Sequence, residues 1–184
     1  MKKNTIRRKS YIEIGNIYFV TCTINQWKLL LHNDDFKIII LDSMDWLCQM
    51  KRWQIFAFVI MPNHIHFIVR NLDINGKEMP HVSFLKLTAH QFKKKLLKEN
   101  KTFLQEFEVD AVNKKYEFWK RDSLAVNLFN RYMAYQKLLY IHLNPIREKW
   151  QLAVDPSDYP FSSASLYEKD HSPYSFLSDL RNEY

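Results

Sequence analysis

The sequence predicts an α+β fold: a single domain in which α-helices cover an antiparallel β-sheet, in a ferredoxin-like or RRM-like layout. Short runs of aromatic and β-branched residues alternate with segments of helical periodicity along the chain. Two of the apolar runs are joined only by proline and asparagine, which favour a tight turn. The length of 184 residues suits one domain with one core.

The first strand is expected over residues 17–25, IYFVTCTIN, a short run rich in aromatic and β-branched residues. Because successive side chains of a strand point to opposite faces, the run predicts one buried face. That face comprises Tyr18, Val20, Cys22 and Ile24.

A helix is expected next, with Asp34 as its N-cap and its last residues near Lys51. Apolar residues recur in it at helical spacing and predict a face that packs on the sheet. The predicted face comprises Phe36, Ile39, Ile40, Leu47 and Met50.

Residues 53–71 contain two apolar runs on either side of Met61-Pro62-Asn63. Proline is poor in a central strand but good in a turn, so we expect a strand, a tight connection and a second strand that starts near His64. Residues 71–80 contain one of the two glycines of the chain and predict a surface loop.

The segment 82–101 predicts an amphipathic helix with a basic outer face. Ser83 is the expected N-cap, and the apolar face comprises Phe84, Leu87, Phe92 and Leu96. Residues 101–122 mix charged and aromatic residues without a clean period, and no element is assigned there.

The C-terminal third of the chain predicts a fourth strand and a third helix. Residues 122–129 alternate Leu124, Val126 and Leu128, as a half-buried strand does. Residues 130–145 are periodic until Asn144-Pro145 stops the helix. Residues 158–176 are turn-rich and are expected to wrap the surface. The predicted organisation is a basic arm (1–16), a domain (17–168) and a C-terminal tail (169–184).

The charge of the chain suggests a polyanionic partner, but by charge alone a merely basic protein fits equally well. Lysine and arginine outnumber aspartate and glutamate by 27 to 20, although a protein can also be basic without a nucleic-acid partner. Cys22 and Cys48 lack any metal-binding spacing and are expected to be small buried thiols in a reducing compartment. No apolar run has the length of a membrane span or signal peptide, which predicts a cytoplasmic protein without a membrane partner. Nucleoid association is expected only if the chain binds DNA.

Two histidines lie two residues apart at the start of the second strand of residues 53–71. In a strand, His64 and His66 point to the same face while Ile65 points to the other, so the two imidazoles can share one cation. The same pattern also arises where two histidines lie at a wet strand edge without chemical purpose.

The predicted third helix carries a second candidate pair. Tyr140 and Asn144 are four residues apart and lie on the same helical face. An amide oxygen beside two imidazole nitrogens leaves room for water and phosphate oxygens, a ligand set that suits Mg²⁺ or Mn²⁺. By spacing alone, Asn144 also fits a helix cap before Pro145, and Tyr140 fits a core residue.

Three separated motifs resemble those of a known family, the REP-associated tyrosine transposases of the HUH single-tyrosine superfamily. They read FVIMPNHIHFIVR, YIHLNPIR and DYPFSS, in the family's order, and the similarity extends from about Tyr18 to Tyr167. The resemblance implies an HUH fold, in which a sheet is covered by helices. The residues from Pro145 to Lys149 depart from the small residue and glycine that relatives commonly carry, which is expected to affect the helix exit rather than the chemistry.

The resemblance implies a metal-dependent DNA strand transferase. His64, His66 and Asn144 match the metal ligands, and Tyr140 matches the nucleophile that forms a 5′-phosphotyrosine intermediate and frees a 3′ hydroxyl. Free tyrosine has a pKa of about 10 and therefore needs activation, which a metal on the scissile phosphate assists. The family recognises palindromic repeat hairpins with an adjoining single-stranded tag, so the implied partner is single-stranded DNA, bound by a monomer or a homodimer.

Three basic clusters are the expected DNA contacts, although any one of them is also typical of a solvated surface. The first cluster lies in the N-terminal arm, which is the expected reader of the tag. The second lies on the predicted second helix, and the third surrounds the tyrosine helix. The candidates are Lys3, Arg7, Arg8, Lys9, Lys93, Lys94, Lys120, Arg121 and Arg147.

Several roles near the tyrosine helix stay open. Tyr116, Phe118 and Trp119 either stack on unpaired bases or pack in the core, and core packing is expected for at least two of them. Gln136 lies one turn before Tyr140 and either assists it or faces solvent, and the solvent-facing role is the one expected.

Two alternatives compete with a transposase. A DNA-binding protein with a vestigial histidine site would bind repeat hairpins without cleaving them. An unrelated metallohydrolase would use the histidine pair without forming a covalent protein–DNA adduct, but the remaining histidines are scattered and form no compact motif.

Overall fold

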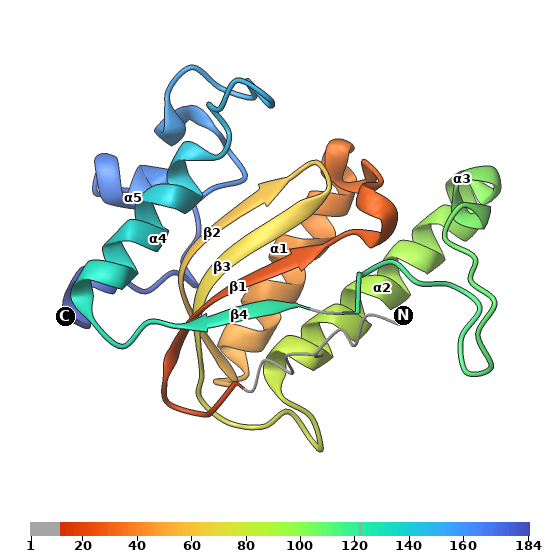
Figure 1. The fold of residues 1–184 in the computed structure, drawn as a ribbon, viewed down its shortest axis with the longest axis horizontal. Coiled ribbons are helices and arrows are strands. Elements are labelled where there is room, and N and C mark those ends of the chain that lie inside the picture. The colour runs from red at the N-terminus through yellow and green to blue at the C-terminus, as the bar shows by residue number, and fades with distance from the viewer. Residues whose placement is uncertain (1–11, 122) are drawn as a thin grey trace, which may run out of the picture.

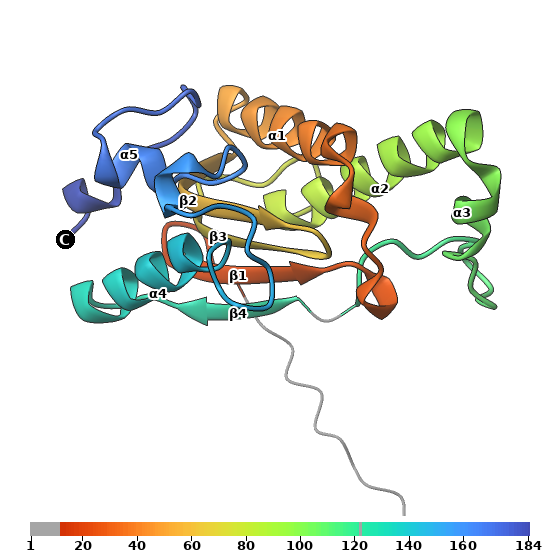
Figure 2. The same ribbon diagram turned by 90° about the horizontal axis from the view of Figure 1, so that it is seen from above.

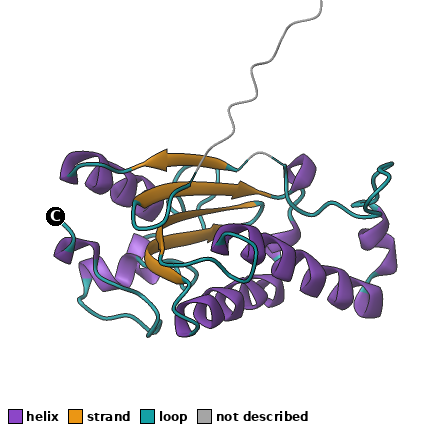
Figure 3. Cartoon of the chain, turned by 90° about the horizontal axis from the view of Figure 1, so that it is seen from below, coloured by secondary structure: helices purple, strands orange, loops and turns teal. Residues whose placement is uncertain are grey.

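The computed structural model describes residues 12–121 and 123–184. Its centre is one four-stranded sheet in the order β2-β3-β1-β4, in which every neighbouring pair of strands is antiparallel. Figure 3 shows the strands side by side, flanked by helices. The fold is therefore the predicted α+β arrangement. The strands are β1 (Ile17–Thr23), β2 (Trp53–Met61), β3 (His64–Asn71) and β4 (Leu124–Asn127).

The turn at Pro62-Asn63 joins β2 and β3 as predicted and brings Met61 opposite His64. The other side of β3 pairs with β1, so β3 is a central strand. β4 is shorter than the predicted run 122–129, and Asp122 lies outside the described residues. β1 ends at Thr23, two residues before the predicted end.

The two faces of the sheet belong to different hydrophobic clusters. Tyr18, Val20, Cys22 and Ile24 lie in one cluster, as the alternation predicts. Phe19, on the opposite face of β1, belongs to the other. Helices α1 (Asp34–Gln49) and α2 (Pro80–Glu99) cover the first face, and α4 (Arg131–Leu143) packs on the second (Figures 1 and 2).

Both predicted caps of the first two helices are wrong. Asn33, not Asp34, caps α1: its side chain accepts a hydrogen bond from the backbone of Asp35 at 2.9 Å. α2 begins at Pro80, before the predicted Ser83 cap, because proline fits the first turn of a helix, where its missing N–H costs nothing.

The buried face of α1 is shifted from the prediction at its C-terminal end. Met44 is fully buried there, whereas Met50 is 49% exposed. The helix ends at Gln49, and Lys51 adopts a left-handed backbone conformation. Met50 therefore lies outside the periodic part of the helix. Cys48 is half-buried rather than buried.

Two helices of five residues were not predicted: α3 (Lys101–Gln105) and α5 (Ala164–Glu168). Residues 106–121 contain no helix and no strand of the sheet. Single 3₁₀ turns occupy Asn25–Trp27, Leu30–His32, Pro156–Asp158 and Leu180–Asn182. Within the described residues, no helix is long and apolar enough to cross a membrane.

The C-terminal residues pack closely on the domain. Leu177 forms a bridge with Ile55 on β2, and Leu180 is fully buried in the cluster under α4. Glu183 forms an ion pair with Arg70 on β3 at 2.5 Å. The turn-rich segment 158–176, expected to wrap the surface, packs on β2 through the bridge between Ser162 and Val59 and buries Tyr159, so it also contributes to the core.

Candidate functional site

A cavity of about 570 Å³ lies on the α4 face of the sheet, where His64, His66, Tyr140 and Asn144 meet. It is bounded by β1, β3, α4, and the turns after β1 and after α4. Its lining comprises Phe19, Thr21, Trp27, His64, His66, Leu124, Lys137, Tyr140, Asn144, Arg147, Lys149 and Trp150.

Strand β3 places the two imidazoles side by side, as its alternation predicts. Their ring centroids are 4.8 Å apart, and the residues are 8% and 4% exposed. The next residue, Ile65, points into the opposite cluster. Thr21 and Thr23 of β1 pair with His66 and His64, so the histidines sit in a central strand and not at a wet edge.

Asn63 fixes the tautomer of His64. Its Nδ2 donates to the carbonyl of Trp27 at 3.1 Å, which turns Oδ1 toward His64. Because this Oδ1 can only accept, the Nδ1 of His64 donates to it, at 2.7 Å. The Nε2 of His64 is left with an available lone pair.

His66 presents a similar nitrogen to the cavity. Its Nδ1 lies 2.8 Å from the hydroxyl of Thr21, whereas its Nε2 is buried and has no hydrogen-bond partner in the described structure. A buried polar atom without a partner is rare because it loses the hydrogen bond that water would make. The ring also stacks on Phe19, with centroids 5.3 Å apart.

Both imidazoles are held neutral. Burial lowers the pKa of His64 to about 4, assisted by the charge of Lys149. Burial also lowers the pKa of His66 to about 3, with further contributions from His64, Arg147 and Lys137. At neutral pH both rings therefore keep the uncharged form that a metal ligand requires.

Helix α4 brings Tyr140 and Asn144 to the same cavity. The ring of Tyr140 lies 5.1 Å from that of His66, centroid to centroid. Asn144 is 3% exposed, and its Nδ2 donates to the backbone carbonyl of Tyr140 at 2.7 Å. Because a carbonyl can only accept, this bond fixes the amide with Oδ1 as its free acceptor. Asn144 is also the C-cap residue of α4, so the cap considered from the sequence is confirmed, whereas its role as a metal ligand stays a prediction.

Three cations line the cavity, and two of them face the tyrosine. The guanidinium of Arg147 lies 4.6 Å from the centre of the Tyr140 ring, and the ammonium of Lys137 lies 5.6 Å from it. Lys149 stands 5.0 Å over the ring of Trp150. Within the described residues, no carboxylate lines this cavity. The site therefore attracts anions.

Several lining residues were not identified from the sequence as parts of the site. Lys137 lies three residues before Tyr140, and that helical spacing is the signal that identifies it. Trp27 and Phe19 carry no such signal, because the pairing of distant segments places them here. The turn after α4 contributes Arg147 and Trp150 to the cavity. The residues from Pro145 to Lys149, which differ from those of the related family, therefore affect the site as well as the helix exit.

The predicted DNA contacts do not form one surface. Arg147 lines the cavity, and the backbone of Lys120 bonds to Thr23, beside His64 in the sheet. Lys93 and Lys94 line a separate hollow on α2, which covers the opposite face of the sheet. Arg121 forms an ion pair with Glu117 at 2.9 Å, outside the cavity. The arm residues Lys3, Arg7, Arg8 and Lys9 lie outside the described residues.

Two of the three neighbouring aromatics pack in the core, as expected. Phe118 stacks on Phe107 with centroids 4.7 Å apart, and Trp119 donates to the hydroxyl of Thr88 at 2.9 Å. Tyr116 is half-buried. Gln136 is exposed and bonds to Tyr132, away from the cavity, as expected.

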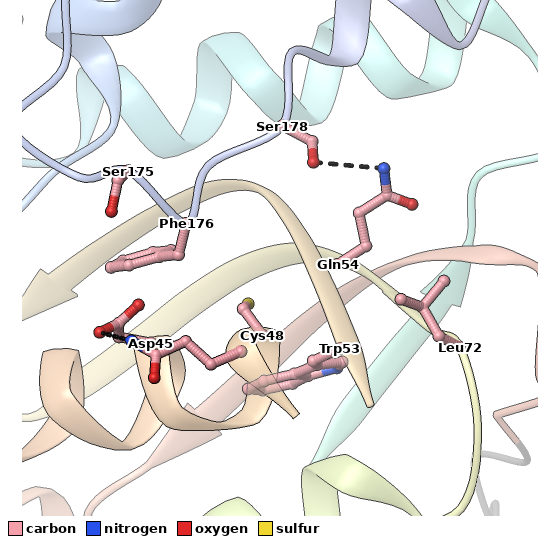
Figure 4. A pocket seen from close by; sticks show the side chains of 9 residues that line it. Asp45, Cys48, Trp53, Gln54, Leu72, Ser175, Phe176 and Ser178 are labelled. Carbon is pink, nitrogen blue, oxygen red and sulfur yellow. Dashed lines mark hydrogen bonds between the residues drawn. The ribbon is translucent and has the colours of Figure 1, made fainter. Parts of the chain in front are cut away.

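A second cavity, of about 500 Å³, lies between α1, the start of β2 and the C-terminal segment (Figure 4). Gln54 donates to Ser178 at 3.2 Å across its wall, and Cys48 contributes a thiol. Burial raises the pKa of that thiol to about 12, with a further rise from Asp45, so it is a poor nucleophile. This cavity lacks the convergent groups of the site under α4.

Comparison with known proteins indicates a fold relationship. No protein-family model and no curated protein matches the chain. A solved structure of a REP-associated tyrosine transposase bound to a REP hairpin is similar at a TM-score of 0.59 and 20% identity, over 96% of this chain and 93% of that chain. A structure of a putative transposase from Deinococcus radiodurans R1 covers 77% of this chain and 95% of its own, at a TM-score of 0.40 and 14% identity, too weak to support a shared fold. The chain thus has the fold of the first protein.

Proposed function

We propose that this chain is a single-tyrosine HUH transposase, related to the REP-associated tyrosine transposases, that cleaves and rejoins single-stranded DNA at palindromic repeat hairpins. The observation that carries the proposal is the meeting of two neutral imidazoles, Asn144 and Tyr140 in one cation-lined cavity. Its fold is that of a transposase whose structure was solved with a REP hairpin. The three sequence motifs support the same assignment.

The residues of the cavity fit a divalent metal. The buried Nε2 of His66 lacks a partner, the Nε2 of His64 has an available lone pair, and the Oδ1 of Asn144 is a free acceptor. The described residues contain no cluster of three or more histidine, cysteine or carboxylate side chains, so a closed protein cage is not formed. Two nitrogens and an amide oxygen instead leave positions for phosphate oxygens, as Mg²⁺ or Mn²⁺ prefers. When bound, the metal would neutralise charge on the scissile phosphate.

Asn63 and Thr21 would orient the two ligands. Each bonds the Nδ1 of one histidine, which leaves Nε2 as the ring nitrogen available to a metal. Such outer partners fix the ring orientation of metal-binding histidines.

Tyr140 would act as the nucleophile. Its phenolic oxygen releases its proton to solvent and forms a bond to the phosphorus of the scissile phosphodiester, and the bond from phosphorus to the 3′ oxygen breaks. The phosphate remains on tyrosine through its 5′ linkage, and the leaving 3′ oxygen takes a proton to become a hydroxyl. Arg147 and Lys137 face the tyrosine ring and would hold the anionic phosphate beside it. Because the phosphodiester energy is retained, the 3′ hydroxyl of another strand can reverse the step.

The test is covalent adduct formation on labelled single-stranded DNA. Purified protein is incubated with a panel of palindromic hairpins that carry single-stranded flanks, with Mg²⁺ or Mn²⁺, and separated on a denaturing gel. We expect a metal-dependent protein–DNA band that is lost in Tyr140→Phe and in His64→Ala. Tyr135→Phe is the matched control, because Tyr135 lies on α4 but does not line the cavity.

The outcomes separate the competing functions. Hairpin binding without any adduct would contradict the proposal and favour a repeat-binding protein with a vestigial site. Metal-dependent DNA hydrolysis without an adduct would instead favour a metallohydrolase. Retention of the adduct in Tyr140→Phe would exclude this tyrosine as the nucleophile.

A further inference from the structure

Two tryptophans stand beside His64 at the cavity. The ring of Trp27, in the turn after β1, lies 6.3 Å from the His64 ring, and the ring of Trp150, in the turn after α4, lies 6.0 Å from it. Both line the cavity that holds Tyr140. The proposed chemistry uses neither ring.

Trp27 is exposed although the surrounding segment is tightly held. The residue is 56% exposed, and its indole makes no hydrogen bond to a described residue. Gln26 and Trp27 have φ values of 56° and 59°, a left-handed conformation that is rare for residues other than glycine. Such strain persists only where the surroundings enforce it, and it clusters at functional sites.

The turn between β2 and β3 enforces this conformation. The Trp27 carbonyl accepts from Asn63, and the backbone of Ile24 donates to the Asn63 carbonyl at 2.9 Å. Leu31 donates to the Pro62 carbonyl, also at 2.9 Å. The backbone that carries the indole is therefore held beside the imidazole that the same asparagine orients. A large, exposed aromatic ring anchored next to the candidate site is suited to stacking on a flat ligand.

The surrounding charge identifies the ligand. Lys149 stands over Trp150, and Lys137 and Arg147 stand over Tyr140. Aromatic rings interleaved with cations are the arrangement that binds single-stranded nucleic acid, through base stacking and phosphate contacts. A second copy of this chain fits poorly, because the formal charge of +7 would bring more positive charge to a cationic cavity.

We propose that Trp27 and Trp150 form a stacking subsite for an unpaired nucleobase. That base is the neighbour of the phosphate at Tyr140, a placement that rests on the proposed function. Stacking would hold the strand in register without reading its sequence, because every base has an aromatic face.

The experiment measures binding without metal, so it does not depend on cleavage. Two labelled 20-nucleotide probes are compared at low salt: single-stranded DNA of random sequence, and a backbone of abasic sites with the same number of phosphates. The proteins are the unchanged chain, Trp27→Leu, Trp150→Leu and Trp46→Leu. Trp46 is the matched control, since it is 43% exposed but lies on α1, away from the cavity.

We expect the unchanged chain to bind DNA more tightly than the abasic backbone. Trp27→Leu and Trp150→Leu should each weaken DNA binding roughly fivefold or more, with little effect on the abasic probe, because stacking contributes about 1–3 kcal/mol per base. Trp46→Leu should behave as the unchanged chain. Equal affinity for both probes, or a DNA preference that survives both cavity substitutions, would overturn the subsite.

Trp27→Gly guards against a folding artefact. Glycine adopts a positive φ without strain, so this variant should keep or raise the melting temperature while it loses the DNA preference. If no hairpin of the panel forms a covalent adduct but the chain still binds DNA more tightly than the abasic backbone, only the proposed function is contradicted. Loss of a dimer in Trp27→Leu on sedimentation, without change in DNA binding, would assign the ring to a second copy and overturn the subsite.

Discussion

The two faces of the sheet differ although they share the same strands. On the α1/α2 face, Ile65 and Phe67 of β3 are completely buried in an apolar cluster. On the α4 face, the alternate residues His64 and His66 line a cavity that contains cations and aromatic rings. The strand alternation alone divides one strand into a structural face and a candidate reactive face.

The covering elements explain the difference. Two long helices, α1 and α2, close the first face, whereas one helix, α4, and C-terminal segments close only part of the second. The cavity beside α4 is lined by polar side chains, among them His66, whose buried Nε2 has no hydrogen-bond partner in the described structure. The candidate reactive groups therefore line the cavity that α4 leaves beside the sheet, and the substitutions below test this difference between the two faces.

Truncation of the closed face should have the largest effect on folding. Phe67 is fully buried and contacts Trp53 and Phe84, with centroids 5.5 and 5.4 Å away. Phe67→Ala should lower the free energy of unfolding by about 3–5 kcal/mol, because it leaves a cavity in the core. His66→Ala should cost much less, since that ring borders an open cavity. Urea denaturation compares the two variants, and an equal loss would contradict the difference between the faces.

Acid should destabilise the protein through its buried histidines. Among them, His142 on α4 lies outside the cavity, so its effect can be measured separately from the site. Burial lowers the pKa of His142 to about 4 from an ordinary value of 6.5. The unfolded chain takes up this proton near pH 6.5, whereas the folded chain resists it until about pH 4. The stability is therefore complete above pH 6.5 and falls as the pH drops through this window.

Between pH 7.5 and 4.5 we expect a loss of about 2–3 kcal/mol from this residue. His64 and His66 shift in the same direction and should add to it. Urea denaturation at the two pH values measures the loss, and His142→Gln, which can still donate to Ser163, should reduce it. An unchanged pH dependence in that variant would show that His142 does not contribute.

Removal of the hydrogen bonds through which Ser163 links α4 to β2 should have an intermediate effect on stability. Ser163 accepts from His142 at 2.9 Å and also bonds the backbone of Phe58 on β2. Ser163→Ala should destabilise the protein by about 1–3 kcal/mol, because it leaves buried groups unpaired. It should also slow adduct formation, since α4 carries Tyr140. The exposed Ser175 is the control, and Ser175→Ala should change neither quantity.

Much of this arrangement could be predicted from the sequence because it depends on local pattern. The alternation around His64, the turn at Pro62 and the four-residue spacing from Tyr140 to Asn144 are local, and the structure brings these residues together. Helix ends were harder, since several residue types compete as caps: Asn33 and Pro80 determine the starts that Asp34 and Ser83 were expected to mark.

Long-range pairing accounts for what the sequence did not predict. Leu180 is buried only because the C-terminal segment returns to the α4 face. Trp27 reaches the cavity only because Asn63, far along the chain, holds its backbone. No periodicity in a single segment contains this information, so the aromatic wall of the site was missed.

The smallest expected effect is a change in the salt dependence of DNA binding, which distinguishes the two basic surfaces. Arg147 lines the cavity, whereas Lys94 lies on α2, across the sheet. Arg147→Ala should reduce the slope of log affinity against log salt by about 0.7 for single-stranded DNA, because one phosphate contact is lost. Lys94→Ala should leave the slope unchanged if DNA lies on the α4 face. A reduced slope in Lys94→Ala alone would place DNA on the α2 side and contradict the comparison.

Covalent linkage of Tyr140 to DNA can be tested by peptide mapping with mass spectrometry. After reaction with a hairpin substrate and nuclease digestion, we expect a nucleotide phosphate on the peptide that contains Tyr140 and on no other tyrosine. Mapping of the phosphate to another residue, or its absence from every peptide while the DNA is cleaved, would contradict it.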